Sequence, residues 1–471
     1  MRPLEILILF LVSLAILALY LPLRFKPGWF RFLPGAIVCV TLAHLVLEHY
    51  RWQMVPAYLL TAALILLTLP NTLKGTERPP SRGAWAVVAG GLGIFWLLVA
   101  AALPILLPVP HLPSPPGRYP IGSIVYDWTD TTRDEIYSAD PDDKRELMVQ
   151  IWYPAVPAAG AQTTLSLIDH WDVAGPAIAQ FLKVPSFAVD HLSLVRTHTY
   201  PDAPIRNTEA PFPVVIYSHG YLGFRTASFD QVEALASSGY IVVGIDHTYG
   251  AMFTVFSDGR VVLNNPAVLP TGDQQASEAL EAAYAADVRF VMDQLELLNA
   301  GRLDARFAGK FDLQRVGLFG HSTGGGAIVW ACHLDPRCKA GLAMDGWFEP
   351  LPETVVSEPL LQPFMFMKSE TKFWEGDNQT RLETLYQGVK EDAIRLTILG
   401  TLHQDFSVLP LVTPLSSLLT ERGPLEGQRT LQIITDYLLA FFNKYLKDQP
   451  TPLLNGPSPD YREVQFESHS P

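Results

Sequence analysis

The distribution of apolar residues divides the sequence near residue 110 and limits what each part can form. Four apolar stretches fill the first part, at roughly 4–23, 33–47, 55–73 and 84–107. A helix needs about 20 predominantly apolar residues to cross a bilayer, and three of the stretches reach that length. The second is shorter, because Glu48 and His49 close it, and a re-entrant segment is the alternative there. We therefore expect residues 1–110 to form a helical membrane domain of about four transmembrane helices.

The first stretch has one alternative interpretation, a cleaved signal peptide, because Arg2 precedes its apolar core. The missing small-x-small cleavage signal and the three later stretches favour a membrane anchor. Cytoplasmic loops are enriched in Lys and Arg, and here the basic residues gather after the first and third stretches. This pattern predicts an integral protein of the cell membrane whose large C-terminal domain is extracytoplasmic. The basic residues compared are Arg24, Lys26, Arg31, Lys74, Arg78 and Arg82 on one side, and Arg2, Arg51 and Arg118 on the other.

Charge and cysteine content exclude some partners. The formal net charge of the chain is -13, and no clustered basic face is visible, so nucleic acid is not an expected ligand. Cys332 and Cys338 lack zinc-ligand spacing, and Cys39 lies in an apolar stretch. Two free thiols at Cys332 and Cys338 are favoured, and a disulfide between them is the alternative. The oligomeric state is left open.

The second part of the chain alternates short β-branched runs with longer helix-like stretches. This rhythm is typical of an α/β domain with a mostly parallel sheet, here spanning 121–450. A proline-rich stretch at 111–120 predicts a stiff stalk before the domain. Residues 154–204 interrupt the rhythm, either as an ordinary excursion packed on the core or as a cap insertion over an acyl pocket. Residues 451–471 are expected to form a C-terminal tail.

One motif points to nucleophilic catalysis. Ser322 stands in Gly320-His321-Ser322-Thr323-Gly324, a G-x-S-x-G pattern that chance produces in many proteins. Its context adds weight, because a strand-like run at 315–319 precedes it and small residues that can open a helix follow. A sharp strand-turn-helix lifts a serine oxygen above the sheet, and the glycines allow the tight backbone. Ser322 is therefore the predicted nucleophile.

A serine hydroxyl needs a base to take its proton and a carboxylate to orient that base. In α/β-hydrolases both follow the nucleophile in sequence. His403 comes after the last strand-like run and is the predicted base, whereas His333 lies several helical turns from Ser322 and His469 lies in the tail. Asp345 directly ends the expected strand 340–344 and is the predicted acid. Glu370 and Glu375, after the next strand, are the competitors, and Asp405 is interpreted as a loop residue.

The tetrahedral intermediate also needs backbone donors for its oxyanion. One should come from Thr323, the residue after the nucleophile, and the other from Tyr221, in a loop that follows an earlier strand. His219 and His321 are interpreted as polar residues that shape these turns. A serine mechanism requires no metal or other cofactor, and none is expected.

Four motifs occur together in a characteristic order. They are Ser218-His219-Gly220 with Gly223-Phe224-Arg225, then the G-H-S-T-G-G run, then 342–347 (LAMDGW), then 403–406 (HQDF). In this order they resemble the type II platelet-activating factor acetylhydrolases over about 117–446. The resemblance implies an α/β-hydrolase fold and metal-independent cleavage of short or oxidised acyl chains from phospholipid sn-2 esters. It supports Ser322, Asp345 and His403 as the triad, with Tyr221 and Thr323 as oxyanion donors.

The sequence also departs from that family. The secreted members have no multi-span membrane segment, and threonine follows the nucleophile where phenylalanine is frequent, which leaves the acyl preference open. The leading hypothesis is a serine hydrolase of short-chain carboxylic esters, with lipid or small esters as substrates and the bilayer as partner. A general carboxylesterase or short-polyester hydrolase is the second reading. A membrane-tethered binding module without activity is the third.

Overall fold

The computed structural model describes residues 1–21, 25, 27–73, 84–163, 166–269, 272–420 and 422–470. Five of the basic residues used for the orientation prediction lie outside these ranges, namely Arg24, Lys26, Lys74, Arg78 and Arg82. The chain forms two compact units. One comprises Met1–Pro110, Lys183–Val195 and Val412–Leu415, and the other comprises the remaining residues.

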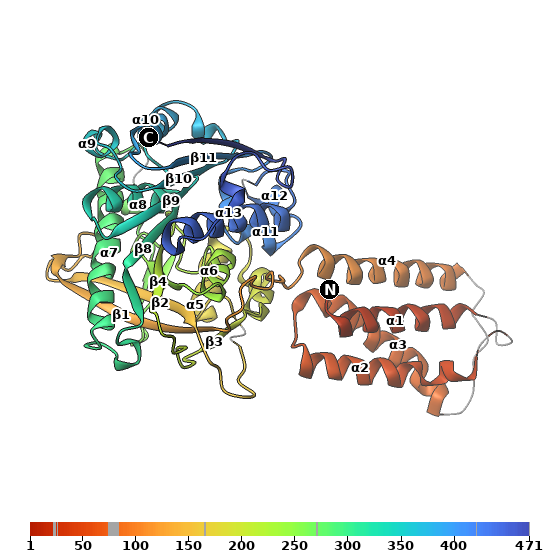
Figure 1. The fold of residues 1–471 in the computed structure, drawn as a ribbon. Coiled ribbons are helices and arrows are strands. Elements are labelled where there is room, and N and C mark those ends of the chain that lie inside the picture. The colour runs from red at the N-terminus through yellow and green to blue at the C-terminus, as the bar shows by residue number, and fades with distance from the viewer. Residues whose placement is uncertain are drawn as a thin grey trace. The chain divides into compact units, whose positions relative to one another are not determined.

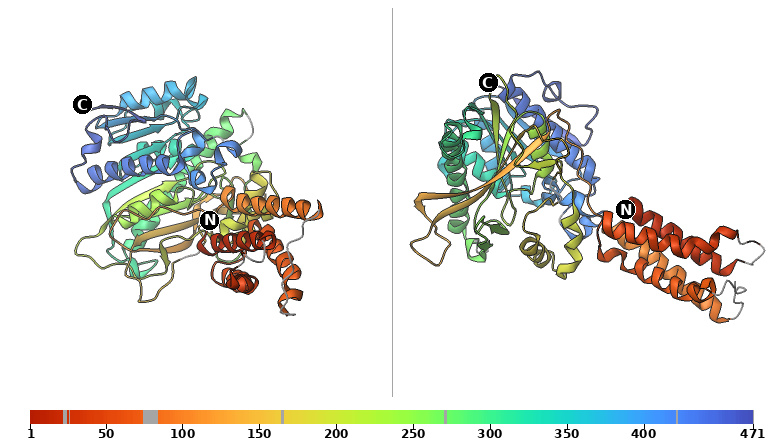
Figure 2. Two further views of the ribbon diagram at one scale, coloured as in Figure 1. Left: turned by 90° about the vertical axis from the view of Figure 1, so that its right-hand side faces the viewer. Right: turned by 90° about the horizontal axis from the view of Figure 1, so that it is seen from below.

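Apolar helices that lie side by side make up most of the first unit (Figures 1 and 2). Ile8, Val12 and Ile37 are buried among them, whereas Leu66 and Val87 remain 74% and 75% exposed on the outside. An apolar exterior of this kind is what lipid contact would favour. The helices are α1 (Pro3–Tyr20), α2 (Leu33–Leu47), α3 (Val55–Leu73) and α4 (Ala84–Leu106), with 3₁₀ turns η2 (Gly28–Phe32) and η3 (Trp52–Met54).

Three segments of this unit are long and apolar enough to cross a membrane, namely Pro3–Tyr20, Gly28–Leu47 and Val87–Leu106. The second expected stretch reaches this length because η2 extends α2 toward its N-terminus. The described part of the third stretch, Trp52–Thr68, is a shorter apolar helix. The second stretch is therefore as well suited to cross a membrane as the first and the fourth, whereas the sequence had left a re-entrant segment as its alternative.

A ten-stranded sheet forms the centre of the second unit, in the order β12-β11-β10-β9-β8-β4-β5-β2-β1-β3. The six strands from β11 to β5 pair in parallel. Antiparallel pairing joins β2 to β5 and β12 to β11, at the two sides of this core. The strands are β1 (Ile121–Asp134), β2 (Lys144–Pro154), β3 (Thr199–Pro201), β4 (Phe212–Ser218), β5 (Ile241–Asp246), β8 (Phe311–His321), β9 (Cys338–Met344), β10 (Phe364–Lys368), β11 (Ala393–Ile398) and β12 (Val464–His469).

Helices cover both faces of this sheet (Figure 2). One face carries α7 (Gln274–Asn299) and α8 (Thr323–Leu334), and the other carries α6 (Phe229–Ser237) and α13 (Gly427–Lys447). The central strands β4 and β5 are buried along their whole length, which explains their continuous β-branched sequences. The α/β-hydrolase fold class expected from the sequence is confirmed. Shorter elements are β6 (Phe253–Val255), β7 (Val261–Leu263), α5 (Trp171–Phe181), α9 (Glu353–Ser357), α10 (Asp377–Gly388), α11 (Leu409–Val412), α12 (Ser416–Leu419), and the 3₁₀ turns η4 (Ser186–Leu194), η5 (Pro266–Val268), η6 (Ala305–Phe307), η7 (Lys372–Trp374), η8 (His403–Phe406) and η9 (Pro452–Leu454).

Residues 154–204, which interrupt the alternation of strands and helices, are divided between the two units. Helix α5 contributes Ala174 to a small apolar cluster with Phe253 and Val255. Residues 183–195 instead pack with the helical unit, where the ring of Phe187 meets Trp52 edge-on at 5.3 Å between centroids.

Two expectations for the second unit are wrong. Cys332, in α8, and Cys338, at the start of β9, form a disulfide with their Cα atoms 5.1 Å apart, because the short helix-to-strand turn brings them together. Cys39 is free. The C-terminal residues are not a plain tail either, since Val464–His469 form the edge strand β12 and supply the hydrogen-bond partners of β11.

Candidate active site

Ser322 lies in a strained turn between β8 and α8. Its backbone has φ 53° and ψ -123°, which side-chain-bearing residues rarely adopt, so the surrounding fold must hold it there. The neighbouring glycines make the turn feasible. A Cβ on Gly320 would lie 2.2 Å from the carbonyl oxygen of Gly324, and one on Gly324 would lie 2.1 Å from that of Ser218. Only glycine fits either position, which is the physical reason for the G-x-S-x-G spacing.

His403 reaches Ser322 from the loop that follows β11. Its Nε2 lies 3.0 Å from the Ser322 Oγ, within hydrogen-bond distance. The loop is held by the buried Asp405, whose carboxylate accepts hydrogen bonds from the amide of Leu402 at 2.8 Å and from Arg422 Nε at 2.6 Å. Asp405 therefore shapes the loop that carries the histidine.

Asp345 stands at the end of β9 with its side chain fully buried. Its Oδ2 lies 2.6 Å from His403 Nδ1, and its Oδ1 accepts hydrogen bonds from the Ser369 amide and from Trp374 Nε1, both at 2.7 Å. Burial alone raises the pKa of Asp345, but the hydrogen bonds that it accepts, above all from His403, hold that pKa below its ordinary value. The carboxylate is therefore ionised at neutral pH.

The competing acids and histidines lie elsewhere. Glu370 and Glu375 are exposed, and Glu370 accepts a hydrogen bond from the Gly400 amide at 2.5 Å. His333 lies 3.4 Å from Glu358, and His469 Nε2 donates to the carbonyl oxygen of Tyr386. Within the described residues, only His403 comes within hydrogen-bond distance of Ser322 Oγ.

The two motif histidines lie in the turns beside the serine. His321 Nε2 donates to the carbonyl oxygen of His403 at 3.1 Å, and the two rings lie 4.7 Å apart between centroids. Burial, with a smaller contribution from the neighbouring His403, lowers the pKa of His321 to about 3, so its ring stays neutral. His219 Nδ1 donates to the carbonyl oxygen of Gly220 at 2.7 Å. Both histidines thus support backbone geometry.

The loop after β4 lies against Ser322, the predicted nucleophile. A Cβ on Gly220 would lie 2.9 Å from the Ser322 Cβ, so Tyr221 follows directly on a backbone in contact with the serine. Thr323 begins α8 with its side chain buried, and its amide is among the unpaired donors of a helix N-terminus. The backbone amides of Tyr221 and Thr323 therefore flank Ser322 from two separate elements.

Sequence reasoning missed Ser369 and Trp374, the additional partners of Asp345. Ser369 directly follows β10, and ligand-binding residues of parallel sheets gather at such strand ends, so its position was a usable signal. Trp374 lies in a turn five residues later in sequence and had no comparable signal.

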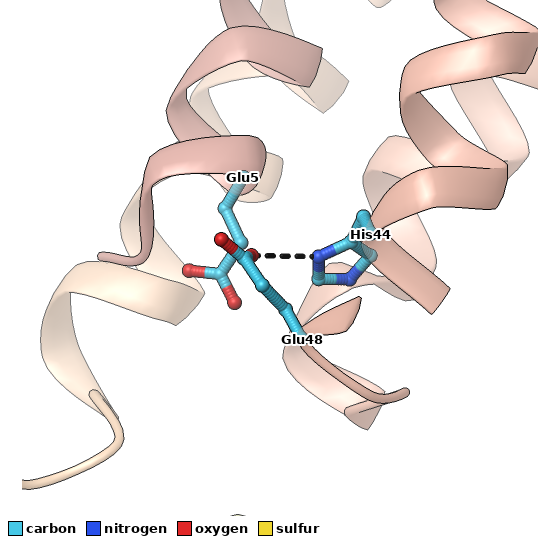
Figure 3. Close-up of side chains that lie close together, drawn as sticks. All are labelled: Glu5, His44 and Glu48. Carbon is cyan, nitrogen blue, oxygen red and sulfur yellow. Dashed lines mark hydrogen bonds and ion pairs between the residues drawn. The ribbon is translucent and has the colours of Figure 1, made fainter. Parts of the chain in front are cut away.

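Of the described residues, one group has the composition of a metal site. Glu5, His44 and Glu48 converge in the helical unit, with ligand atoms within 4.8 Å of one another (Figure 3). However, Arg51 already binds both carboxylate oxygens of Glu5, at 2.7 and 2.6 Å, and Arg2 adds a third contact at 2.8 Å. A divalent cation would have to displace these guanidinium groups. The geometry fits an ion-pair network that joins the helices.

The mostly parallel sheet, with a serine in a strained strand-to-helix turn, defines an α/β-hydrolase. A family model described as "Platelet-activating factor acetylhydrolase, isoform II" matches residues 110–265 and 273–452. The chain belongs to this family.

Individual relatives agree with this assignment. Platelet-activating factor acetylhydrolase of Canis lupus familiaris is 26% identical over 267 residues, 52% of this chain and 59% of that protein, so the match spans little more than half of the relative. A probable 1-alkyl-2-acetylglycerophosphocholine esterase of Arthroderma benhamiae is 26% identical over 79% of this chain and 98% of its own length. Among solved structures, a ferulic acid esterase from Streptomyces cinnamoneus has a TM-score of 0.61 and 27% identity, covering 76% of this chain and 99% of its own.

Proposed function

We propose that this protein is a carboxylic ester hydrolase with Ser322 as nucleophile, His403 as base and Asp345 as the orienting acid. The observation that carries the proposal is the hydrogen-bonded chain from Ser322 Oγ to His403 Nε2 at 3.0 Å and from His403 Nδ1 to Asp345 Oδ2 at 2.6 Å. The ionised Asp345 keeps a proton on Nδ1 and leaves Nε2 free to accept one.

The reaction then runs through an acyl-enzyme. Ser322 Oγ attacks the ester carbonyl carbon while its proton passes to His403 Nε2. The amides of Tyr221 and Thr323 donate to the oxyanion. His403 next protonates the leaving alkoxide as the carbon–oxygen bond breaks. A water molecule, deprotonated by His403, attacks the acyl carbon, and the proton returns to Ser322 as the acid product leaves.

Short-chain esters of lipids, including sn-2 acyl esters of glycerophospholipids, are the substrates we propose. The names of the dog and fungal relatives support this choice. A general carboxylesterase, acting also on short polyesters, is the second candidate, and similarity to an esterase of ferulic acid favours it. Comparing turnover of a short-chain nitrophenyl ester, methyl ferulate and a phospholipid with a short sn-2 chain would separate these candidates.

We further propose that the apolar helices anchor the enzyme in the cell membrane with the hydrolase unit extracytoplasmic. Three segments have the required length and apolarity. The Cys332–Cys338 disulfide supports an extracytoplasmic position, because disulfides persist mainly in oxidising compartments. Reporter fusions after residue 114 that report a cytoplasmic location would contradict this topology.

Covalent labelling with a fluorophosphonate probe tests the catalytic proposal. Labelling should occur in the full-length protein and disappear in Ser322→Ala. Ser357→Ala is the matched control, because Ser357 is an exposed serine on α9 that donates only to a backbone carbonyl. If the wild-type protein did not label, the alternative hypothesis of a membrane-tethered binding module without activity would be favoured. Labelling that survives Ser322→Ala would reject Ser322 as the nucleophile.

A further inference from the structure

A second Ser-His-Asp chain lies in the interior of the hydrolase unit. Ser218 Oγ lies 2.9 Å from His247 Nε2, and His247 Nδ1 lies 2.9 Å from Asp287 Oδ2. All three side chains are fully buried. The hydrogen-bond pattern repeats that of Ser322, His403 and Asp345, but no solvent reaches this serine. Because Ser218 is buried, it cannot act as a second nucleophile. The three residues can act only through the structure around them.

The charge at the inner end of this chain is fixed. Asp287 accepts Arg145 Nε at 3.0 Å and Nη2 at 2.6 Å, and Arg133 Nη2 at 2.8 Å. Burial raises the pKa of Asp287, but Arg145 and the hydrogen bonds from His247 outweigh it and hold that pKa far below its ordinary value. An ionised Asp287 accepts only, so His247 must carry its proton on Nδ1. The ring of Tyr284 stacks on His247 at 3.7 Å between centroids and fixes its plane.

The side chain and the backbone of His247 both hold the loop that leads to Tyr221. With its proton on Nδ1, His247 accepts at Nε2, so Ser218 donates its hydroxyl proton to it. The backbone amide of His247 donates to His219 Nε2 at 3.2 Å, which requires the proton of His219 to lie on Nδ1, where it is donated to the Gly220 carbonyl oxygen. Two runs of hydrogen bonds thus meet at His247. Its side chain links Ser218 to Asp287, and its backbone amide links through His219 to the Gly220 carbonyl oxygen.

Ser218 and Gly220 are also the residues against which the nucleophile turn rests. A Cβ on Gly324 would meet the Ser218 carbonyl oxygen at 2.1 Å, and one on Gly220 would meet Ser322 Cβ at 2.9 Å. The backbone between them leads directly into Tyr221. A shift of the Ser218 end of the loop would therefore move the Tyr221 amide relative to Ser322.

We propose that Ser218, His247 and Asp287 are positioning residues that aim the Tyr221 amide at the oxyanion. The inference rests on the proposed function of Ser322 and Tyr221. An oxyanion donor contributes about 10²–10³-fold to kcat when it is aligned, so partial misalignment should cost about 10- to 100-fold. The loss should fall on kcat, because the donor acts on charge that develops only in the transition state.

Ser218→Ala is the central test, since it removes a single hydroxyl and leaves the His247–Asp287 pair intact. We expect kcat for a short-chain nitrophenyl ester to fall about 10-fold or more, with KM within about twofold. The rate of fluorophosphonate labelling should fall in parallel, because the phosphyl oxygen occupies the same hole. Ser237→Ala is the matched control, as Ser237 is a buried serine at the end of α6 that donates to the Ala234 carbonyl oxygen.

His247→Asn supplies a second measurement. Its amide can still donate toward Asp287 but lacks the acceptor for Ser218. The double variant with Ser218→Ala should lose little more than the worse single variant, because the two residues act through one chain. If His247→Asn fails to fold, Ser218→Ala still decides the outcome.

The outcomes separate this inference from the proposed function. Full kcat in Ser218→Ala, with labelling still abolished in Ser322→Ala, would overturn the positioning role and leave the triad standing. If the melting temperature fell while kcat per labelled site stayed unchanged, Ser218, His247 and Asp287 would stabilise the fold without positioning the Tyr221 amide. Labelling that persists in Ser322→Ala would instead reject the proposed function itself.

Discussion

Replacing Asp345 by Asn is the sharpest test of the catalytic geometry. The Oδ1 of Asp345 accepts two donors, the Ser369 amide and Trp374 Nε1, both at 2.7 Å. An asparagine must keep its oxygen there, because an amide NH₂ facing two N–H donors would leave buried groups unpaired. Its NH₂ then points at His403 Nδ1, which now lies 2.6 Å from Asp345 Oδ2. The imidazole can accept this donor only by moving its proton to Nε2.

The shifted proton faces Ser322 Oγ, so His403, the proposed base, can no longer accept the hydroxyl proton. The same substitution in a serine protease triad lowers kcat about 10⁴-fold, which corresponds to about 5.5 kcal/mol of transition-state stabilisation. We expect a loss of this size in the steady-state hydrolysis of a short-chain nitrophenyl ester. KM and the thermal unfolding temperature should change little, because the variant keeps the shape of the side chain.

Glu370→Gln is the matched control, because Glu370 is the exposed acid after the next strand and a glutamine can still accept from the Gly400 amide. Its activity should stay within about twofold of wild type, since surface substitutions rarely perturb a distant site. If Asp345→Asn kept a tenth of the wild-type kcat, or if Glu370→Gln lost as much as Asp345→Asn, the assignment of the acid would be wrong.

Three further predictions concern stability. Reducing the Cys332–Cys338 bond should lower the free energy of unfolding by about 2 kcal/mol for so short a loop, and thiol titration of the unfolded protein should rise from one group, Cys39, to three after reduction. Both carboxylate oxygens of the fully buried Glu281 lack a hydrogen-bond partner among the described residues, and burial raises the pKa of Glu281 well above its ordinary value. The folded protein should therefore lose stability as pH rises from the ordinary pKa of a glutamate to this raised pKa. Glu281→Gln should therefore be more stable than wild type at alkaline pH and lose that advantage below about pH 4, and an equal pH dependence in both proteins would refute this. The pKa of His321 is lowered to about 3 in the folded protein, whereas the unfolded chain binds a proton at this imidazole below about pH 6.5. The free energy of unfolding should therefore fall by up to about 1.4 kcal/mol per pH unit as pH drops from 6 to 3. Thermal melts across that range should show a smaller slope in His321→Gln.

The sequence alone determined the features that depend on neighbours along the chain. Apolar length separated the helical part from the α/β part near residue 110, and β-branched runs located the central strands within a few residues. The turn around Ser322 was also readable, because the two positions without room for a Cβ, Gly320 and Gly324, each lie only two residues from the serine in sequence. The motif order further led to the family to which the chain belongs.

Only the tertiary structure decided features that depend on which distant segments meet. The contact of His403 with Asp345, rather than Glu370, depends on the fold of the loop after β11. Since β10 lies between β9 and β11 in the sheet, strand order alone would not select Asp345. The edge strand β12 likewise follows from pairing with β11 that no local pattern encodes. His247 and Asp287 show no motif at all, because their hydrogen bonds form between a strand end and a helix 40 residues away in sequence. Local sterics can be read residue by residue, whereas the partners of a buried polar group depend on how the sheet is assembled.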